Sequence, residues 1–335
     1  MSSGPSLILS NNANHQPTMN FLLNISVGSF VTISNFSIKT GIDYLECIKV
    51  LEELSKSGFL EKWLAFRCPE CGLLLKTVKP EDYAIESQYC THCDMDVDIV
   101  SDSVEVLFKV VNNPFATGQE NKTIIPEHSS ALKNSSLETF LKNGGNFNSE
   151  LFCPSDEEYQ MLAEKFNNIF KPHSTTKGKG DSLESLVLSL FRCCKIFKAT
   201  DKIRLADNQI DCFIRNKCLI PFISQICTND FFVIECKNEQ GTPGITYFNK
   251  LHSILINNSL QFGIIISKKR AAKTLNSFAH KIFLQNKMIM INLDCDDIER
   301  IIIDKVNLLE CLERKIAEVK FNASADLIKL GLFDG

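Results

Sequence analysis

The sequence lacks long hydrophobic runs. None of its apolar stretches approaches the roughly eighteen residues that a membrane-spanning helix requires. The first residues, MSSGPSLILSNNANHQ, also lack the basic region and the longer apolar segment of a secretion signal. These absences argue against a membrane span and against export. We therefore expect a cytoplasmic protein with no membrane partner.

A nucleotide-binding loop is missing as well. The segment TTKGKGDS, residues 175–182, looks superficially like a phosphate-binding loop but lacks the G-x-x-x-x-G-K-[ST] spacing. The sequence thus argues against nucleotide hydrolysis. We instead expect Lys177 and Lys179 to form a basic entry to the helix that follows and to contact nucleic acid.

Charge is distributed unevenly along the chain. The 335 residues carry a net charge of −4, with 44% hydrophobic and 23% charged residues, an ordinary composition for a soluble protein of more than one domain. The balance is −5 in residues 1–100, −5 in residues 101–160 and +6 in residues 161–335. A surface that binds a polyanion is therefore expected in the C-terminal half.

Changes in residue composition and hydrophobic pattern along the chain predict a multidomain α/β protein. After residue 156, apolar β-rich runs alternate with helical patterns, which favours a mixed sheet flanked by helices. The predicted segments are a flexible N-terminus at 1–17, a winged helix-turn-helix at 18–66, a zinc ribbon at 67–110, a linker with one short helix at 111–155, and an α/β domain at 156–335.

The segment 18–66 resembles a winged helix-turn-helix. It contains a short helix, a glycine turn, a longer helix with Leu45, Ile48, Leu51 and Leu54 on one face, and then a strand. The outward residues of the longer helix are expected to be mainly acidic: Asp43, Glu46, Glu52 and Glu53 against Lys49 and Lys56. Because such a face repels phosphate, we favour a protein-interaction or self-association module, with DNA reading as the alternative.

Four of the fourteen cysteines are organised as two knuckles. Cys68 and Cys71 lie in CPECG, and Cys90 and Cys93 lie in CTHC. Two Cys-x-x-Cys pairs at this spacing are typical of a tetrahedral zinc site whose role is structural, because four protein ligands leave no open position. A redox pair is the alternative, and His92 is a possible substitute ligand.

A run of acids and one lysine follows in the C-terminal half. In the expected strand FFVIECK, Glu235 and Lys237 project from one face while Cys236 points to the other. Asp211 stands within the apolar sequence QIDCFI, where an unpaired carboxylate is costly. Glu184 lies in the first turn of a predicted helix. Taken alone, Glu235 and Lys237 would be an ordinary ion pair at a strand end, but the other acids favour a catalytic site.

The stretches KGDSLE, QIDCFI and VIECKN resemble the sequence motifs of the PD-(D/E)xK nuclease superfamily, particularly its Mrr-type restriction endonuclease branch. The resemblance covers about residues 156–305 and includes QFGIIISKKRAAKTLNSFAHKIF and MIMINLDCDDIERII as a later and a closing strand and helix. It implies that Asp211, Glu235 and the backbone carbonyl of Cys236 bind Mg²⁺ or Mn²⁺. It also implies that Lys237 activates or orients the attacking water and that Glu184 supports the metal site.

Two departures from the family pattern concern the substrate. Gln209 stands where some relatives carry an acid, and the helix after Lys237 lacks a glutamine that some families place there. Lys250 in that helix either contacts phosphate in its place or is simply solvated. A second basic cluster, either binding nucleic acid or forming a solvated face, comprises Lys268, Lys269, Arg270 and Lys273.

The resulting hypothesis is a metal-dependent DNA endonuclease acting in restriction or antiviral defence, as the resemblance implies. Duplex DNA is the expected substrate, and a protein partner or a second copy is expected at the winged helix. The alternatives are a nucleic-acid-binding adaptor or regulator without catalysis, and a nuclease directed at RNA or at DNA junctions.

Overall fold

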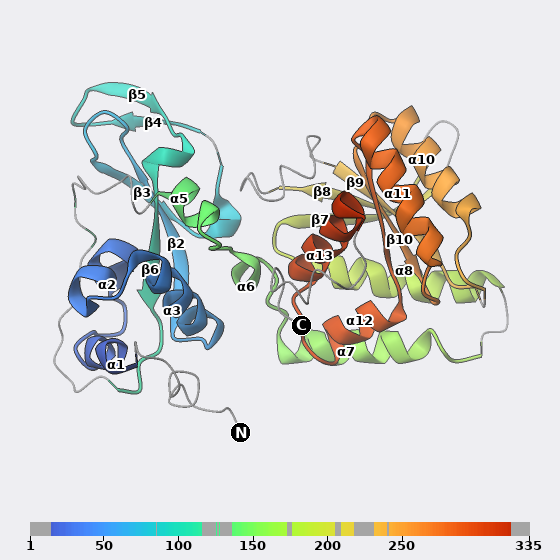
Figure 1. Cartoon of the computed structure of the whole chain (residues 1–335), viewed down its shortest axis with the longest axis horizontal. Helices are drawn as coiled ribbons and strands as arrows, with labels where there is room; N and C mark the ends of the chain where they lie inside the picture. Colours follow the sequence, from blue (N-terminus) through green and yellow to red (C-terminus); the bar gives the residue numbers. More distant parts are fainter. Residues whose placement is uncertain are drawn as a thin grey trace. The chain divides into compact units, whose positions relative to one another are not determined.

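The structure is a computed structural model that divides into two compact units, Met1–Glu150 and Leu151–Gly335 (Figure 1). It describes residues 15–84, 86–115, 125, 127, 136–172, 176–204, 209–217, 231–239 and 241–322. Within these ranges no helix is both long enough and apolar enough to cross a bilayer. The chain combines helices with several sheets, which confirms the predicted α/β class.

The first unit mixes helices and strands along the chain, with β1 between α1 and α2. Its helices are α1 (His15–Leu23), α2 (Ile33–Thr40), α3 (Tyr44–Lys56), α5 (Leu137–Lys142) and α6 (Asn148–Leu151). Its strands are β1 (Phe30–Thr32), β2 (Leu60–Arg67), β3 (Leu74–Val78), β4 (Ser87–Cys90), β5 (Met95–Asp98) and β6 (Val104–Val110).

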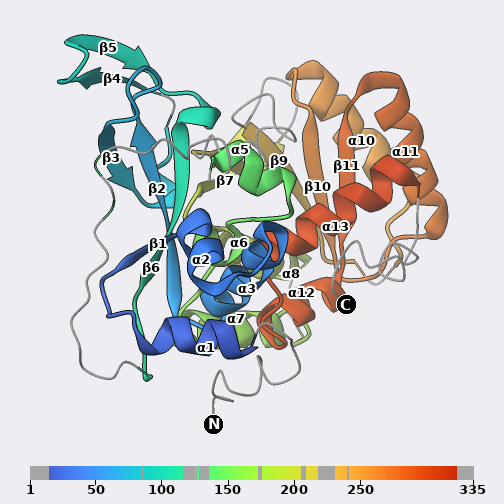
Figure 2. The same cartoon turned by 60° about the vertical axis from the view of Figure 1, so that its left-hand side comes forward.

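A four-stranded antiparallel sheet in the order β1-β6-β2-β3 organises the described part of this unit, and β4 and β5 form a separate hairpin (Figure 2). Strand β6 pairs with both β1 and β2, with Trp63 opposite Leu107. The last strand of the predicted ribbon segment therefore completes the sheet that begins in the predicted winged helix. The cysteine-bearing segment is inserted between β2 and β6.

Helix α3 is amphipathic but does not have the predicted faces. Asp43 caps its first turn, because its side chain accepts a hydrogen bond from the backbone of Leu45. Leu45 itself is 49% exposed, so its assignment to the apolar face is wrong. Glu52, predicted to point outward, is also placed wrongly, because it is buried and pairs with Lys62.

Lys62 is the centre of a buried ionic network. Its side chain is fully buried, and its ammonium group lies 2.6 Å from Glu52 and 3.2 Å from Glu150. It also donates a hydrogen bond to the backbone carbonyl of Asn146. The ring of Phe147 packs against the same ammonium group. Part of the predicted 111–155 linker thus packs into the first unit rather than only connecting two domains.

The second unit is built around a five-stranded sheet in the described residues, with the order β11-β10-β9-β8-β7. Its strands are β7 (Phe197–Arg204), β8 (Gln209–Asn216), β9 (Phe231–Lys237), β10 (Phe262–Ser267) and β11 (Ile289–Leu293). Its helices are α7 (Asp156–Asn168), α8 (Thr176–Arg192), α10 (Ile245–Asn257), α11 (Lys273–Asn286), α12 (Cys295–Ile302) and α13 (Leu308–Phe321).

One strand of this sheet, β8, runs opposite to the other four described strands. Strands β9, β10 and β11 run parallel, whereas β8 is antiparallel to both β7 and β9. Such a mixed sheet is common where an antiparallel hairpin is added to a parallel core. The central strand β9 is buried through its apolar residues, and its polar C-terminal end lies between β8 and β10.

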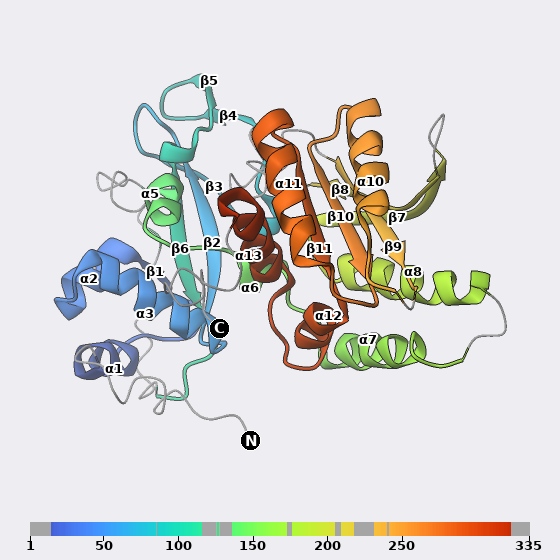
Figure 3. The same cartoon turned by 45° about the vertical axis from the view of Figure 1, so that its right-hand side comes forward.

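Helices cover both faces of the sheet (Figure 3). Helix α8 packs against β7, β8 and β9, with Phe191 of the helix meeting Phe232 of β9 edge to face. Helix α10 packs against β10 on the opposite face. A Cβ atom at Gly263 of β10 would lie 2.9 Å from the side chain of Leu251 of α10, so the missing side chain allows the close approach of this helix.

The network around Lys62 gives a stability test. In Lys62→Met, Glu52 and Glu150 would remain buried without their cation, so we expect unfolding of the first unit to become about 3–5 kcal/mol easier at neutral pH. A buried carboxyl without its cation has a raised pKa. The deficit should therefore shrink as the pH falls from this raised pKa toward the unfolded value of about 4.3, below which the carboxyl groups are protonated in both the folded and the unfolded protein.

Denaturant unfolding at pH 7 and pH 5 measures this effect, and Lys49→Met is the matched control. Lys49 also pairs with a glutamate, Glu46, but its side chain is 69% exposed, so its loss should cost less than about 1 kcal/mol. Equal losses in the two variants would contradict the buried-network account.

Candidate functional site

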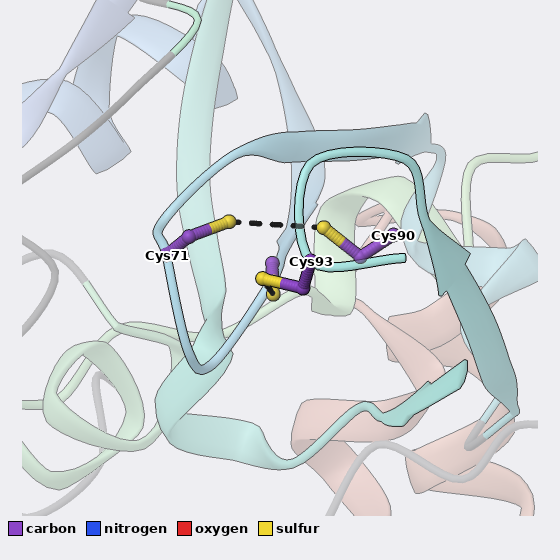
Figure 4. Close-up of side chains that lie close together, drawn as sticks. Cys71, Cys90 and Cys93 are labelled. Carbon is purple, nitrogen blue, oxygen red and sulfur yellow. Dashed lines mark hydrogen bonds between the residues drawn. The ribbon is translucent and has the colours of Figure 1, made fainter. Parts of the chain in front are cut away.

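The four organised cysteines converge at one point. The sulfur atoms of Cys68, Cys71, Cys90 and Cys93 all lie within 4.8 Å of one another. The Sγ atoms of Cys68 and Cys93 are 3.8 Å apart, and those of Cys71 and Cys90 are 3.7 Å apart. Figure 4 shows Cys71 and Cys90 facing each other from different segments of the chain.

This geometry fits a tetrahedral zinc ion. Four sulfur atoms placed at about 2.3 Å from one zinc ion lie about 3.8 Å from each other. The two knuckles also turn alike, because Gly72 and Asp94, which follow Cys71 and Cys93, have positive φ values of 72° and 55°. His92 is not part of the cluster found among the described residues. The cluster is therefore compatible with zinc bound by four thiolates.

A second group of polar side chains lies at the C-terminal end of β9. The register of β8 and β9 pairs Cys212 with Ile234, so one residue further along Asp211 stands opposite Glu235 on the same face of the sheet. One carboxylate oxygen of Asp211 accepts a hydrogen bond of 2.8 Å from the backbone N–H of Cys236. The two acids that the sequence separates by 24 residues are neighbours in the fold.

Glu235 is the most deeply buried residue of this group, with only 1% of its surface exposed. Its Oε2 atom lies 2.8 Å from Nζ of Lys250 and 3.4 Å from Nζ of Lys237. Its Oε1 atom is buried and has no hydrogen-bond partner among the residues that the structure describes. A buried carboxylate oxygen without a partner is costly, so this atom points to an additional ligand.

Lys237 and Lys250 reach the same carboxylate from different elements. Lys237 lies at the end of β9, and its ammonium group packs over the ring of Tyr247 at 5.1 Å. Lys250 comes from α10 and is held over the sheet by the close packing of that helix. Lys250 is 40% exposed while it pairs with Glu235, and contact of this lysine with phosphate stays a prediction.

Glu184 of α8 completes the acidic group. Its Oε2 atom lies 3.1 Å from Nζ of Lys202, which also lies 2.8 Å from Asp181. Burial raises the pKa of the Glu184 carboxyl, and the negative charge of Asp211 raises it further, whereas the hydrogen bond from Lys202 lowers it. The mutual influence of Glu184 and Asp211 places both acids within one electrostatic environment.

Lys202 is a residue of this site that the sequence analysis missed. It has a positive φ of 43°, and the β7–β8 register passes from the pair Asp201 and Cys212 directly to Ile203 and Ile210. The register is unchanged across this step, so Lys202 stands opposite Asp211 at a local interruption of the β7–β8 ladder. No pattern in the sequence distinguishes this lysine from a solvated one.

The donors around Glu235 suit a hard divalent cation. Carboxylate oxygens are the ligands that Mg²⁺ and Mn²⁺ prefer. Asp211 and Glu235 supply them at the end of β9, and Oε1 of Glu235 has no hydrogen-bond partner among the described residues. Cys236 is not a competing thiolate ligand, because burial and the charge of Asp211 raise the pKa of its thiol. Among the described residues, the four cysteines are the only group of three or more such side chains whose ligand atoms converge, so a metal ion at these acids stays a prediction.

The predicted basic residues have different environments. The Nζ atom of Lys268 donates a hydrogen bond to the carbonyl of Ile169 at 3.2 Å and lies 4.6 Å from the ring centre of Phe170. Lys269 and Arg270 are exposed. The side chains of Lys177, Lys179 and Lys273 lie outside the described residues. Contact of any of these residues with nucleic acid remains a prediction.

No protein-family model matches the chain, and no curated protein matches it. Among solved structures, the chain is similar to the DNA modification-dependent restriction endonuclease AspBHI, with 14% sequence identity and a TM-score of 0.27. That match covers 84% of this chain and 74% of the other. A TM-score this low does not establish a shared fold, so the function must be argued from the site itself.

The cysteine cluster predicts the metal content of the protein. Purified protein should carry about one zinc ion per chain, and Cys68→Ser should release it and destabilise the segment between β2 and β6. Elemental analysis of the folded protein measures this. Cys153→Ser, which removes an exposed cysteine outside the cluster, should keep its zinc. Protein without zinc, with all four thiols reactive in the native state, would exclude the site.

Proposed function

We propose that this protein is a metal-dependent DNA endonuclease of the PD-(D/E)xK type, with a restriction-endonuclease-like second unit. The observation that supports it most is the buried Oε1 atom of Glu235, which has no hydrogen-bond partner among the described residues and belongs to the residue next to Asp211 in the β8–β9 register. A strand-end ion pair alone would need neither Asp211 nor Glu184 beside it.

Each side chain has a distinct role in this proposal. Asp211 and Glu235 would hold the Mg²⁺ or Mn²⁺ ion, with the backbone carbonyl of Cys236 as a further ligand. The bound ion would supply Lewis-acid stabilisation of the phosphate and an acidified water molecule. Glu184, held by Lys202, supports the acidic group from the side of α8.

Lys237 would orient and stabilise the attacking water. Its side chain is 18% exposed, and its ammonium group lies beside Glu235 and over the ring of Tyr247, contacts that would hold it next to the scissile phosphate. Lys250 shares Glu235 with Lys237 and contributes positive charge near the same carboxylate. Preorganised charge of this kind acts mainly on the transition state.

In the first unit we infer a winged helix with a zinc ribbon inserted in place of its wing, because β6 completes the sheet after the cysteine segment. Burial of Glu52 leaves three outward acids, Asp43, Glu46 and Glu53, against Lys49 and Lys56 at α3. That face keeps one net negative charge, so it gives phosphate no net attraction. We assign the unit to self-association or to a protein partner, and the whole protein to restriction or antiviral defence.

Single substitutions should separate the proposed roles. Asp211→Ala and Glu235→Ala should abolish cleavage and weaken binding of Mn²⁺. Lys237→Ala should lower the cleavage rate about a hundredfold or more while metal and DNA remain bound, because the lysine acts mainly in the transition state. Cleavage of labelled duplex DNA and titration with Mn²⁺ measure both properties.

Lys281→Ala, an exposed lysine of α11, is the matched control and should cleave at the wild-type rate. If Glu235 and Lys237 are only a strand-end ion pair, Lys237→Ala will lose some stability, roughly 1 kcal/mol or less, and keep any cleavage. Cleavage by folded Lys237→Ala protein at the wild-type rate would defeat the proposed role of this lysine.

The charge distribution predicts which unit binds DNA. Residues 151–335 should retain most of the affinity for duplex DNA, with a strong dependence on salt, and residues 1–150 should bind weakly or not at all. The boundary at 150 keeps Glu150 with its partner Lys62. Binding curves at several salt concentrations test this, and tight sequence-specific binding by the first unit would reverse the assignment.

A further inference from the structure

A basic pocket lies at the edge of the sheet of the second unit, away from the acidic group. Its volume is about 580 Å³, and it is lined by Arg192, Phe197, Lys198, Ala199, Arg215 and Lys217. Four of the six lining residues are cationic and none is acidic. Within the described part of the chain, no carboxylate forms an ion pair with any of these four cations. We call this site the strand-edge pocket.

The cations come from separate elements that meet at strand β7. Lys198 of β7 and Arg215 of β8 are direct partners in the antiparallel register, so two like charges stand side by side. Such a pair is destabilising unless an anion joins it. The guanidinium group of Arg215 is held over the ring of Phe231 at 5.7 Å. Arg192, at the end of α8, donates a hydrogen bond to the carbonyl of Ala199.

Protection of the sheet edge does not account for this arrangement. Lysines on an edge strand discourage pairing with other chains, and Lys198 on β7 would serve that purpose. However, Arg215 lies on the inner strand β8, and Arg192 lies on a helix. Protection of the edge strand from pairing with another chain requires neither Arg215 nor Arg192. Convergence of three elements on one concave site is instead typical of a binding site.

Lys198 and Arg215 of the strand-edge pocket share one face of the sheet with Asp211, whereas Ala199 alternates with Lys198 and projects toward the opposite face. Asp211 and Arg215 are four residues apart on β8, so their side chains project to the same side. Four residues of strand span about 13 Å. Along a DNA strand this distance corresponds to roughly four phosphates measured on the helix axis. One nucleic-acid strand can thus reach both sites.

We propose that the strand-edge pocket binds a backbone phosphate of DNA, about four nucleotides from the bond that the acidic group cuts. Arginine supplies planar, paired donors that match phosphate, and lysine adds charge. The position relative to the cut rests on the proposed nuclease function, whereas the binding of phosphate does not. The contact carries no base recognition and contributes affinity and register.

A binding experiment in EDTA tests the pocket without cleavage. The full-length protein is titrated against a fluorescent 30-base-pair duplex at several salt concentrations. The pocket variant is Lys198→Gln with Arg215→Gln. The control is Lys281→Gln with Lys287→Gln, two exposed lysines of the α11 region, which packs against the opposite edge strand β11. Both variants lose two positive charges, so they differ only in where the charge is lost.

We expect the pocket variant to bind the duplex about tenfold more weakly than wild type. The slope of log affinity against log salt concentration should be smaller in magnitude by about 2. The control should bind within about twofold of wild type. Melting temperatures establish that each variant is folded. Arg192→Gln with Lys217→Gln serves as a second pocket variant if the first does not fold.

Equal binding by the pocket variant and the control would overturn the proposal, as would failure of the wild-type protein to bind the duplex. Parallel titrations with single-stranded DNA and RNA of the same length identify the preferred nucleic acid. If the pocket variant loses affinity only for RNA, the assignment of the pocket to DNA is contradicted. A pocket variant that self-associates but binds DNA normally would show that the cations only guard the edge. Wild-type protein that binds in the expected pattern but cuts nothing with Mg²⁺ would contradict the proposed function and leave the phosphate site intact.

Discussion

The buried carboxylate of Glu235 is the constraint on which the second unit depends. A carboxylate that is 1% exposed is costly to bury unless opposite charges and hydrogen bonds lie close to it. Strand β9 ends between β8, which carries Asp211, and β10, which carries Gly263. Because Gly263 has no side chain, helix α10 packs closely there and brings Lys250 to Glu235. The sheet positions these groups, and an additional ligand at Oε1 would complete them.

The first unit uses a different means of holding polar groups inside. Lys62 joins α3, β2 and the segment before Glu150 through one fully buried ammonium group. The inserted cysteine segment, by contrast, has a very small core made of Cys68, Cys90 and Val97, with a few partly buried neighbours such as Leu73. A core of so few side chains is too small to stabilise a fold by itself. A bound zinc ion would therefore supply most of the stability of the cysteine segment.

Local patterns were sufficient to predict much of this structure. The sequence predicted strands β8, β9, β10 and β11 and the helices that follow β10 and β11. These predictions were possible because strand and helix periodicities are local. Contacts between distant segments were not readable. Glu52 was predicted to face solvent because its helix does not reveal Lys62, and the pairing of β6 with β2 spans the whole cysteine insertion. Lys202 pairs with Glu184 from a position with a positive φ, which the sequence does not reveal. The opposed placement of Asp211 and Glu235 follows from register, which two isolated strands do not specify.

The central claim is that the acids at the end of β9 form a metal-dependent phosphodiester hydrolysis site. The most direct measurement is incubation of the purified full-length protein with plasmid, linear duplex, single-stranded DNA and RNA, each with Mg²⁺ or with EDTA. The account predicts cleavage of DNA with internal cuts in the plasmid, present with Mg²⁺ and absent with EDTA. Cleavage that persists in EDTA, or no cleavage of any of the four substrates with Mg²⁺ or Mn²⁺, would contradict it.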